Sequence, residues 1–125
     1  MSASALIIED EPAVARLEKR ILERLGFRVA VHQKAEEGYA EALAGGFDLI
    51  LLDVMLEQDS GFELARRLKT EPKTRSVPII YVTARDASDD MAEGFASGGA
   101  VYLTKPFSEK NLETAIQAVL SCDKG

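Results

Sequence analysis

The chain has 125 residues, of which 46% are hydrophobic and 29% are charged, the balance of an ordinary globular protein. Fifteen basic against twenty-one acidic residues give a net charge of −6, which argues against non-specific nucleic-acid binding. No apolar run approaches the roughly 20 residues that span a membrane, and no basic stretch of a secretory signal opens the chain. The lone cysteine, Cys122, permits no internal disulfide and fits a reducing compartment. These features predict one cytoplasmic domain over residues 1–125, with a core from about 5 to 120.

The first half of the chain alternates short apolar runs with segments of helical spacing. Residues 5–8 are wholly apolar, as in a strand buried on both faces of a parallel sheet. A helix is expected from Pro12, because Asp10 or Glu11 can cap it, and Gly26 ends it. Its expected inward face is apolar and consists of Val14, Leu17, Ile21, Leu22 and Leu25. The next expected elements are a strand over 27–31, a helix over 35–44 and a strand over 48–53.

The second half continues the same alternation. The expected elements are a helix over 61–69, a polar connection over 70–77, a strand over 78–83, a weaker helix over 88–96 and a strand over 100–103. Ser108 then caps a final helix with one apolar face. Regular alternation of strand and helix predicts an α/β fold, with helices on both faces of a parallel sheet.

Polar residues stand where the predicted strands end, which is where such sheets form their sites. The first strand runs into Glu9 and Asp10, the third ends at Asp53, the fourth at Thr83, and the fifth leads to Lys105. If the strand order is 2-1-3-4-5, the ends of the first and third strands are neighbours and their carboxylates converge. Two carboxylates about 4 Å apart repel by about 4 kcal/mol at an effective dielectric constant of about 20. Such a cluster therefore needs a cation, a lysine or protonation.

The residue types at these strand ends suit phosphoryl chemistry. An oxygen-only cluster with few ligands suits Mg²⁺, which takes one or two carboxylates together with phosphoryl oxygens. Asp53 can act as a carboxylate nucleophile toward phosphorus, which gives an acyl phosphate. Thr83 offers a hydroxyl to the added phosphoryl oxygens, and Lys105 supplies a positive charge.

Four motifs at these strand ends resemble those of the receiver domain of two-component response regulators. They are Ile8-Glu9-Asp10-Glu11-Pro12, Leu51-Leu52-Asp53-Val54-Met55, Val82-Thr83-Ala84 and Tyr102-Leu103-Thr104-Lys105-Pro106-Phe107. The resemblance covers essentially the whole chain, from Ala5 to Leu120, and each motif stands at its own strand end. It implies a doubly wound, flavodoxin-like fold, with a five-stranded parallel sheet in the order 2-1-3-4-5.

The resemblance also implies a role for each matching residue. Asp53 is expected to accept a phosphoryl group from the phosphohistidine of a histidine kinase or a phosphotransfer protein. The metal ligands for Mg²⁺ or Mn²⁺ would be Glu9, Asp10, Asp53 and the backbone carbonyl of Met55, with Asp10 the likelier direct ligand of the acidic pair. Thr83 and Lys105 would contact the phosphoryl group, Tyr102 would be the switch aromatic, and the Lys105-Pro106 bond would be cis.

The implied function is a signalling switch rather than a stand-alone enzyme. Phosphorylation is expected to change a partner-binding surface around the fourth helix, the fifth strand and the fifth helix. The output partner, or an effector domain outside this sequence, is not identified by these residues. The chain departs from the family pattern in the acid at position 9, in the acids Glu57 and Asp59 after the acceptor, and in Ala100-Val101 before Tyr102.

Three other functions compete with the switch. A Mg²⁺-dependent phosphohydrolase needs a general acid two residues after its nucleophile, where Met55 stands. A nucleotide or flavin binder needs a glycine-rich turn after the first strand, and the sequence has none there. A receiver that acts only as a docking module is disfavoured by the complete set of acids, threonine and lysine.

Five further residues receive specific interpretations. Tyr102 fits ordinary half-buried packing as well as a moving switch, and His32 is interpreted as a solvated loop residue rather than a phosphorylation site. Met55 and Arg85 are expected to flank the approach of water, so that changing either alters the rate of phosphoryl hydrolysis. Cys122 is interpreted as an inert thiol near the end of the last helix.

Overall fold

A computed structural model describes residues 3–56, 60–83 and 101–122 of the chain. The elements in chain order are β1 (Ala3–Ile8), α1 (Pro12–Arg24), β2 (Phe27–His32), α2 (Ala35–Ala44), β3 (Leu49–Asp53), α3 (Gly61–Thr70), β4 (Ile79–Thr83), β5 (Val101–Thr104) and α5 (Glu109–Cys122). These elements match the predicted alternation to within a few residues at each end. The helix expected over 88–96 lies outside the described residues.

The five strands form one parallel sheet in the order β2-β1-β3-β4-β5, which confirms the predicted fold class and strand order. β1 and β3 are hydrogen-bonded neighbours, with Ile8 opposite Leu52. The strand order reverses at β1, because β2 lies on one side of it and the later strands on the other. Sites in doubly wound sheets form beyond the carboxyl ends of the strands at this reversal.

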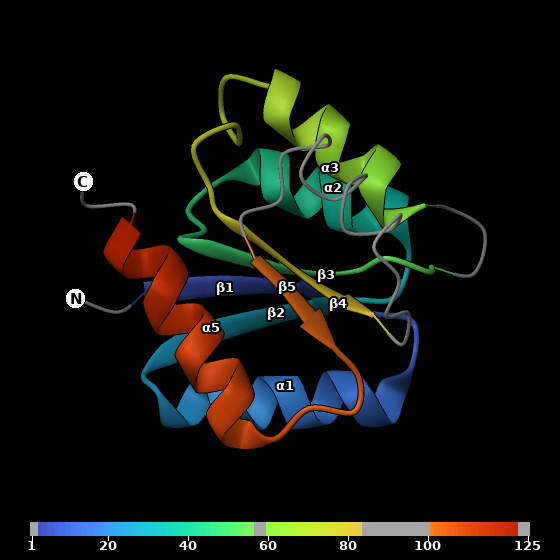
Figure 1. Cartoon of the computed structure of the whole chain (residues 1–125). Helices are drawn as coiled ribbons and strands as arrows, with labels where there is room; N and C mark the ends of the chain where they lie inside the picture. Colours follow the sequence, from blue (N-terminus) through green and yellow to red (C-terminus); the bar gives the residue numbers. More distant parts are fainter. Residues whose placement is uncertain (1–2, 57–59, 84–100, 123–125) are drawn as a thin grey trace.

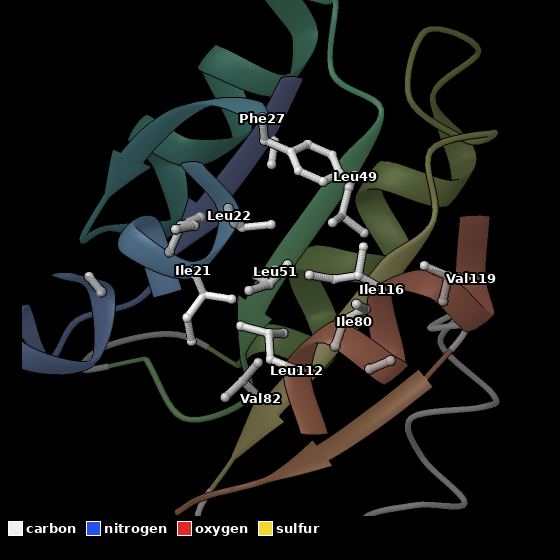
Figure 2. Packing of buried hydrophobic residues seen from close by; sticks show 14 residues of the cluster. Ile21, Leu22, Phe27, Leu49, Leu51, Ile80, Val82, Leu112, Ile116 and Val119 are labelled. Carbon is white, nitrogen blue, oxygen red and sulfur yellow. The ribbon is translucent and has the colours of Figure 1, made fainter. Parts of the chain in front are cut away.

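The helices cover both faces of the sheet (Figure 1). α1 and α5 lie against one face, and α2 and α3 lie against the other. Successive strand residues point to opposite faces, so Ile7 packs toward α1 and α5 while Ile8 packs toward α2 and α3. Figure 2 shows the first core, in which side chains of the sheet meet those of the two helices. Its labelled members are Ile21, Leu22, Phe27, Leu49, Leu51, Ile80, Val82, Leu112, Ile116 and Val119.

The inward face of α1 differs from the expected one. Ile21 and Leu22 are buried as predicted, but Leu17 and Leu25 are more than a third exposed. Their places toward the sheet are taken by Ala15 and by an acid, Glu18. The prediction was wrong because it ranked positions by apolar character, whereas the docking of α1 turns a slightly different stripe inward.

The caps of two helices show where sequence reading succeeds and fails. Ser108 accepts a hydrogen bond at its Oγ from the Asn111 N–H at 3.0 Å, and Asn111 Oδ1 accepts one from the Ser108 N–H at 3.2 Å, so the predicted cap of α5 is confirmed. Glu11 occupies the N-cap position of α1, but its side chain makes no capping bond. Within the residues that the structure describes, no helix combines the length and apolar character of a membrane span.

Candidate functional site

Three carboxylates meet where β1 and β3 end. Glu9 and Asp10 follow β1 directly, and Asp53 is the last residue of β3. One carboxylate oxygen from each lies within 4.8 Å of the other two, so the strand order brings together acids that are far apart in the sequence. Glu9 and Asp53 are almost fully buried, with 1% and 4% of their surfaces exposed. Strand alternation places both on the sheet face that α1 and α5 cover.

Lys105 inserts its ammonium group among these acids. Its Nζ donates hydrogen bonds to Glu9 Oε2 at 3.1 Å and to Glu11 Oε1 at 2.8 Å, and it lies 3.8 Å from Asp53 Oδ2. The backbone N–H of Lys105 donates to the Thr83 carbonyl at 2.6 Å, which fixes the start of the loop beside the end of β4. The Lys105-Pro106 peptide bond is cis.

The buried acids hold their protons more tightly than free carboxyls do. Burial, followed by repulsion from Glu9, raises the pKa of Asp53 to about 8, although Lys105 and the Met55 N–H act in the opposite direction. Burial also raises the pKa of Glu9 and outweighs its attraction to Lys105. The pKa of Lys105 is raised, because its bond to Glu11 and the charges of Glu9 and Asp53 overcome the lowering effect of burial. One lysine therefore only partly neutralises the cluster.

The loop after Asp53 fixes the orientation of its carboxylate. The Met55 N–H donates to Asp53 Oδ1 at 3.1 Å, while the Met55 side chain is largely exposed. The Gly61 N–H donates to the Val54 carbonyl at 2.8 Å, which brings the start of α3 against this loop. A Cβ at position 61 would lie 2.8 Å from Val54 Cα, so only glycine fits this approach. No sequence pattern marks Gly61 as part of the site.

Thr83 and Tyr102 lie on the neighbouring strands β4 and β5. Thr83 is fully buried, and Tyr102 is partly buried against the core between the sheet and the helices α2 and α3. Tyr81 pairs with Tyr102 across the two strands, and Thr83 follows Tyr81 by two residues, so all three side chains belong to the same sheet face. The Tyr102 ring lies 6.1 Å from the Tyr81 ring and 6.5 Å from the Phe62 ring, centroid to centroid.

The structure corrects two smaller interpretations. His32 ends β2 rather than lying in a loop, and its Nε2 lies 2.9 Å from Glu41 Oε1. Glu11, which had been considered only as a cap, is a partner of Lys105. Several residues that were given expectations lie outside the described ranges: Glu57, Asp59, Ala84, Arg85 and Ala100, together with the side chain of Cys122.

The donor set at the end of β1 and β3 fits a hard divalent cation. Its side-chain ligands are all carboxylate oxygens, which Mg²⁺ and Mn²⁺ prefer. Glu9 Oε1 is buried and has no hydrogen-bond partner among the described residues. Such an acceptor is costly unless a positive group or a donor reaches it, and a cation held by Glu9, Asp10 and Asp53 would remove that cost.

A groove of about 390 Å³ opens beside this cluster. Its lining is mainly apolar and joins the start of α1 to the loop that follows β5. The lining residues are Glu11, Val14, Leu17, Lys105, Pro106 and Phe107. The exposed side chain of Leu17, which does not fit the expected inward face of α1, is therefore part of the lining of this groove.

Comparison with known proteins identifies the family. The family model for the response regulator receiver domain matches residues 5–117. The chain belongs to the response regulator receiver family. Receiver domains are signalling domains that bind Mg²⁺ at an acidic site, and in this chain Glu9, Asp10 and Asp53 form such a cluster.

Curated relatives include two regulators of known name. The chain is 39% identical over 113 residues to the nisin biosynthesis regulatory protein NisR of Lactococcus lactis subsp. lactis, covering 90% of this chain and 48% of NisR. It is 38% identical over 115 residues to the phosphate regulon transcriptional regulatory protein PhoB of Pseudomonas aeruginosa, covering 92% of this chain and 50% of PhoB. The receiver thus spans about half the length of the curated relatives it matches.

Solved receiver structures share the whole architecture. A CheY-like receiver domain protein from Methanospirillum hungatei JF-1 superposes with a TM-score of 0.91 at 26% identity, covering 99% of this chain and 98% of that one. The receiver domain of sensor histidine kinase PA1611 from Pseudomonas aeruginosa PAO1 gives 0.86 at 28% identity, covering 94% and 97%. That structure holds a magnesium ion coordinated in its active site cleft.

Proposed function

We propose that this receiver accepts a phosphoryl group on Asp53 from a phosphohistidine and changes a partner-binding surface in response. One observation carries the proposal: Asp53 lies with Glu9 and Asp10 in a compact carboxylate cluster, 3.8 Å from the Lys105 ammonium. This arrangement joins a nucleophile to the positive charge that a phosphoryl group needs. The same residues carry out the transfer within the domain, so the domain is a switch rather than a stand-alone enzyme.

Each residue of the site has its own proposed role in phosphoryl transfer. Asp53 attacks phosphorus through a carboxylate oxygen, and the phosphohistidine nitrogen leaves on the opposite side. The Met55 N–H holds Asp53 Oδ1, so the other oxygen, Oδ2, is the one turned toward Lys105. Lys105 then pairs with the phosphoryl oxygens. Glu9, Asp10, Asp53 and the Met55 carbonyl would hold Mg²⁺ or Mn²⁺, which supplies positive charge to the transferred group when bound.

The response is proposed to pass along β4 and β5. The Thr83 hydroxyl bonds the added phosphoryl oxygens, and Tyr102 moves into the space that Thr83 leaves. Their position on one sheet face supports this coupling, because movement of Thr83 changes the packing next to the Tyr81 and Tyr102 rings. The surface that changes is proposed to include the fourth helix, β5 and α5; the fourth helix lies outside the described residues.

The partner that donates the phosphoryl group is proposed to be a histidine kinase or a phosphotransfer protein in the cytoplasm. The apolar groove beside Lys105 is proposed to contact such a protein. The acidic net charge supports a domain that contacts neither nucleic acid nor membrane directly. Residues 1–125 are proposed to act as one receiver unit.

The test is phosphorylation by acetyl phosphate with Mg²⁺, followed by intact-protein mass spectrometry. The parent protein should gain one phosphoryl group, and Asp53→Asn should gain none. Asp48→Asn is the matched control, because Asp48 precedes β3 at its other end. Gain in both single variants would reject Asp53 as the acceptor. No gain in the parent would favour a receiver that acts only as a docking module.

A further inference from the structure

Helix α1 carries a buried acid on the face that packs against the sheet. Glu18 shares the inward face of the helix with Ala15, Ile21 and Leu22. Its surface is 1% exposed, and neither carboxyl oxygen has a hydrogen-bond partner in the part of the chain that the structure describes. α1 covers the sheet face to which strand alternation assigns Glu9 and Asp53 (Figure 1).

Three charged groups of the site act electrostatically on Glu18. They are Glu9 at the end of β1, Asp53 at the end of β3 and Lys105 in the loop after β5. Burial first, and then repulsion from Glu9 and Asp53, raise the pKa of Glu18 to about 9, while Lys105 acts in the opposite direction. An ionised carboxylate without a partner is very costly in an apolar interior, so Glu18 is neutral as long as no further positive charge is nearby.

A divalent cation in the cluster changes this balance. The single charge of Lys105 already lowers the pKa of Glu18. A doubly charged ion held by Glu9 and Asp53 would lower it more strongly. Glu9 Oε1 and both oxygens of Glu18 are the buried acceptors left without partners among the carboxyls of this region as described. An apolar side chain would occupy position 18 without this cost, as Ile21 and Leu22 do one turn later. The acid therefore affects the site through its charge.

We propose that Glu18 is a positioning residue of the divalent-cation site, which acts through Glu9 and gives up its proton when the cation binds. The inference rests on the proposed function, because it needs a divalent cation at Glu9, Asp10 and Asp53. The O–H bond of Glu18 breaks, the proton leaves to solvent, and the electron pair stays on the carboxylate. The affinity for the cation then rises more steeply with pH than it would if only the three ligands lost protons.

Isothermal titration calorimetry of the full chain with MgCl₂ tests this inference. Titrations at about pH 6, 7 and 8 in buffers of different ionisation enthalpy count the protons released per Mg²⁺. Glu18→Gln keeps the shape of the side chain but cannot ionise. Glu37→Gln is the matched control, because Glu37 is an exposed acid of α2, which covers the sheet face opposite to α1 (Figure 1). Circular dichroism verifies that each variant is folded.

The parent protein and Glu37→Gln should release more protons per Mg²⁺ than Glu18→Gln, by up to about one. Glu18→Gln should also bind Mg²⁺ about threefold or more weakly than the parent at about pH 8. Equal proton release in all three proteins overturns the role of Glu18 and leaves the proposed function intact. No Mg²⁺ binding by the parent overturns both. If Glu18→Gln does not fold, Glu18→Met is judged by the same proton count.

Discussion

The electrostatic character of this receiver is set by a few buried side chains. Asp53 and Glu9 are nearly inaccessible to water, and Lys105 is shared among them and the exposed Glu11. Lys105 is closer to both glutamates than to Asp53, so the carboxylate of Asp53, the proposed acceptor, is the least neutralised of the three. Before Lys105 can pair with a phosphoryl group on Asp53, its hydrogen bond to Glu9 or to Glu11 would therefore have to break.

Replacing Glu18 by Leu should stabilise the cation-free protein at high pH. Its pKa is about 9 in the folded protein and near 4.5 when unfolded. The unfolded chain therefore loses this proton first, and stability falls as pH rises between these two values. Between about pH 5.5 and 8, Glu18 lowers the free energy of unfolding by about 3 kcal/mol. Asp53 and Glu9, with raised pKa values, act in the same direction.

Urea unfolding in EDTA at these two pH values measures the effect. The parent should lose stability on going to about pH 8, and Glu18→Leu should lose about 3 kcal/mol less. Glu37→Gln, an exposed acid in α2, serves as the comparison and should follow the parent. Parallel pH dependence of the parent and Glu18→Leu would show that Glu18 is ionised in the folded state.

At the scale of elements, the join between β3 and α3 determines how Asp53 is held. Gly61→Ala should cost about 1–3 kcal/mol, because its Cβ would lie 2.8 Å from Val54 Cα and backbone must move. Phosphorylation by acetyl phosphate should slow as well, since Val54 follows the acceptor. Gly38→Ala is the comparison, because its Cβ would meet side-chain atoms of Ile8 and not backbone. Chemical denaturation and phosphorylation rates should rank Gly61→Ala as the more damaging change; the reverse ranking would contradict the role of this backbone contact.

The caps of α5 and α3 provide a second comparison between elements. Ser108 Oγ accepts from the Asn111 N–H at 3.0 Å within a reciprocal pair, whereas Ser60 Oγ accepts from the Glu63 N–H at 3.4 Å. Ser108→Ala should therefore cost about 1 kcal/mol, and Ser60→Ala should cost less. Thermal or urea unfolding of the two variants checks the order. An equal loss in both would mean that the geometry of the α5 cap adds nothing.

Sequence patterns predicted the elements well but not the contacts that distinguish this receiver. Buried strands are short, wholly apolar runs, and glycine or serine marks several of the helix ends, so their order could be read directly. The face of α1 could not, because helical spacing allows Leu17 or Glu18 to point inward and apolar character favours the wrong one. The need for glycine at position 61 depends on the distance between α3 and the loop after Asp53, which no local pattern records.

At the scale of the whole molecule, topology assembles the site. Glu9, Asp53 and Lys105 are separated by dozens of residues and meet because parallel strands end at one edge of the sheet. Their positions at strand ends were visible in the sequence. That β1 and β3 are adjacent depends on the strand order, which periodicity does not specify. Only the structure shows that Glu11 contacts Lys105 and that Glu18 is buried, because both features depend on how α1 packs.

The acidic edge should make the stability of the whole domain depend on divalent cations. A cation that binds the folded site and not the unfolded chain stabilises the protein, by about 1.4 kcal/mol at about ten times its dissociation constant. The gain should be larger at about pH 8 than at pH 6, because protons compete for Glu9 and Asp53, whose pKa values are raised. Urea unfolding with Mg²⁺ or with EDTA measures this difference. Asp10→Asn should lose most of the gain and Glu37→Gln should keep it; an equal gain in Asp10→Asn would place the cation outside the cluster at the end of β1.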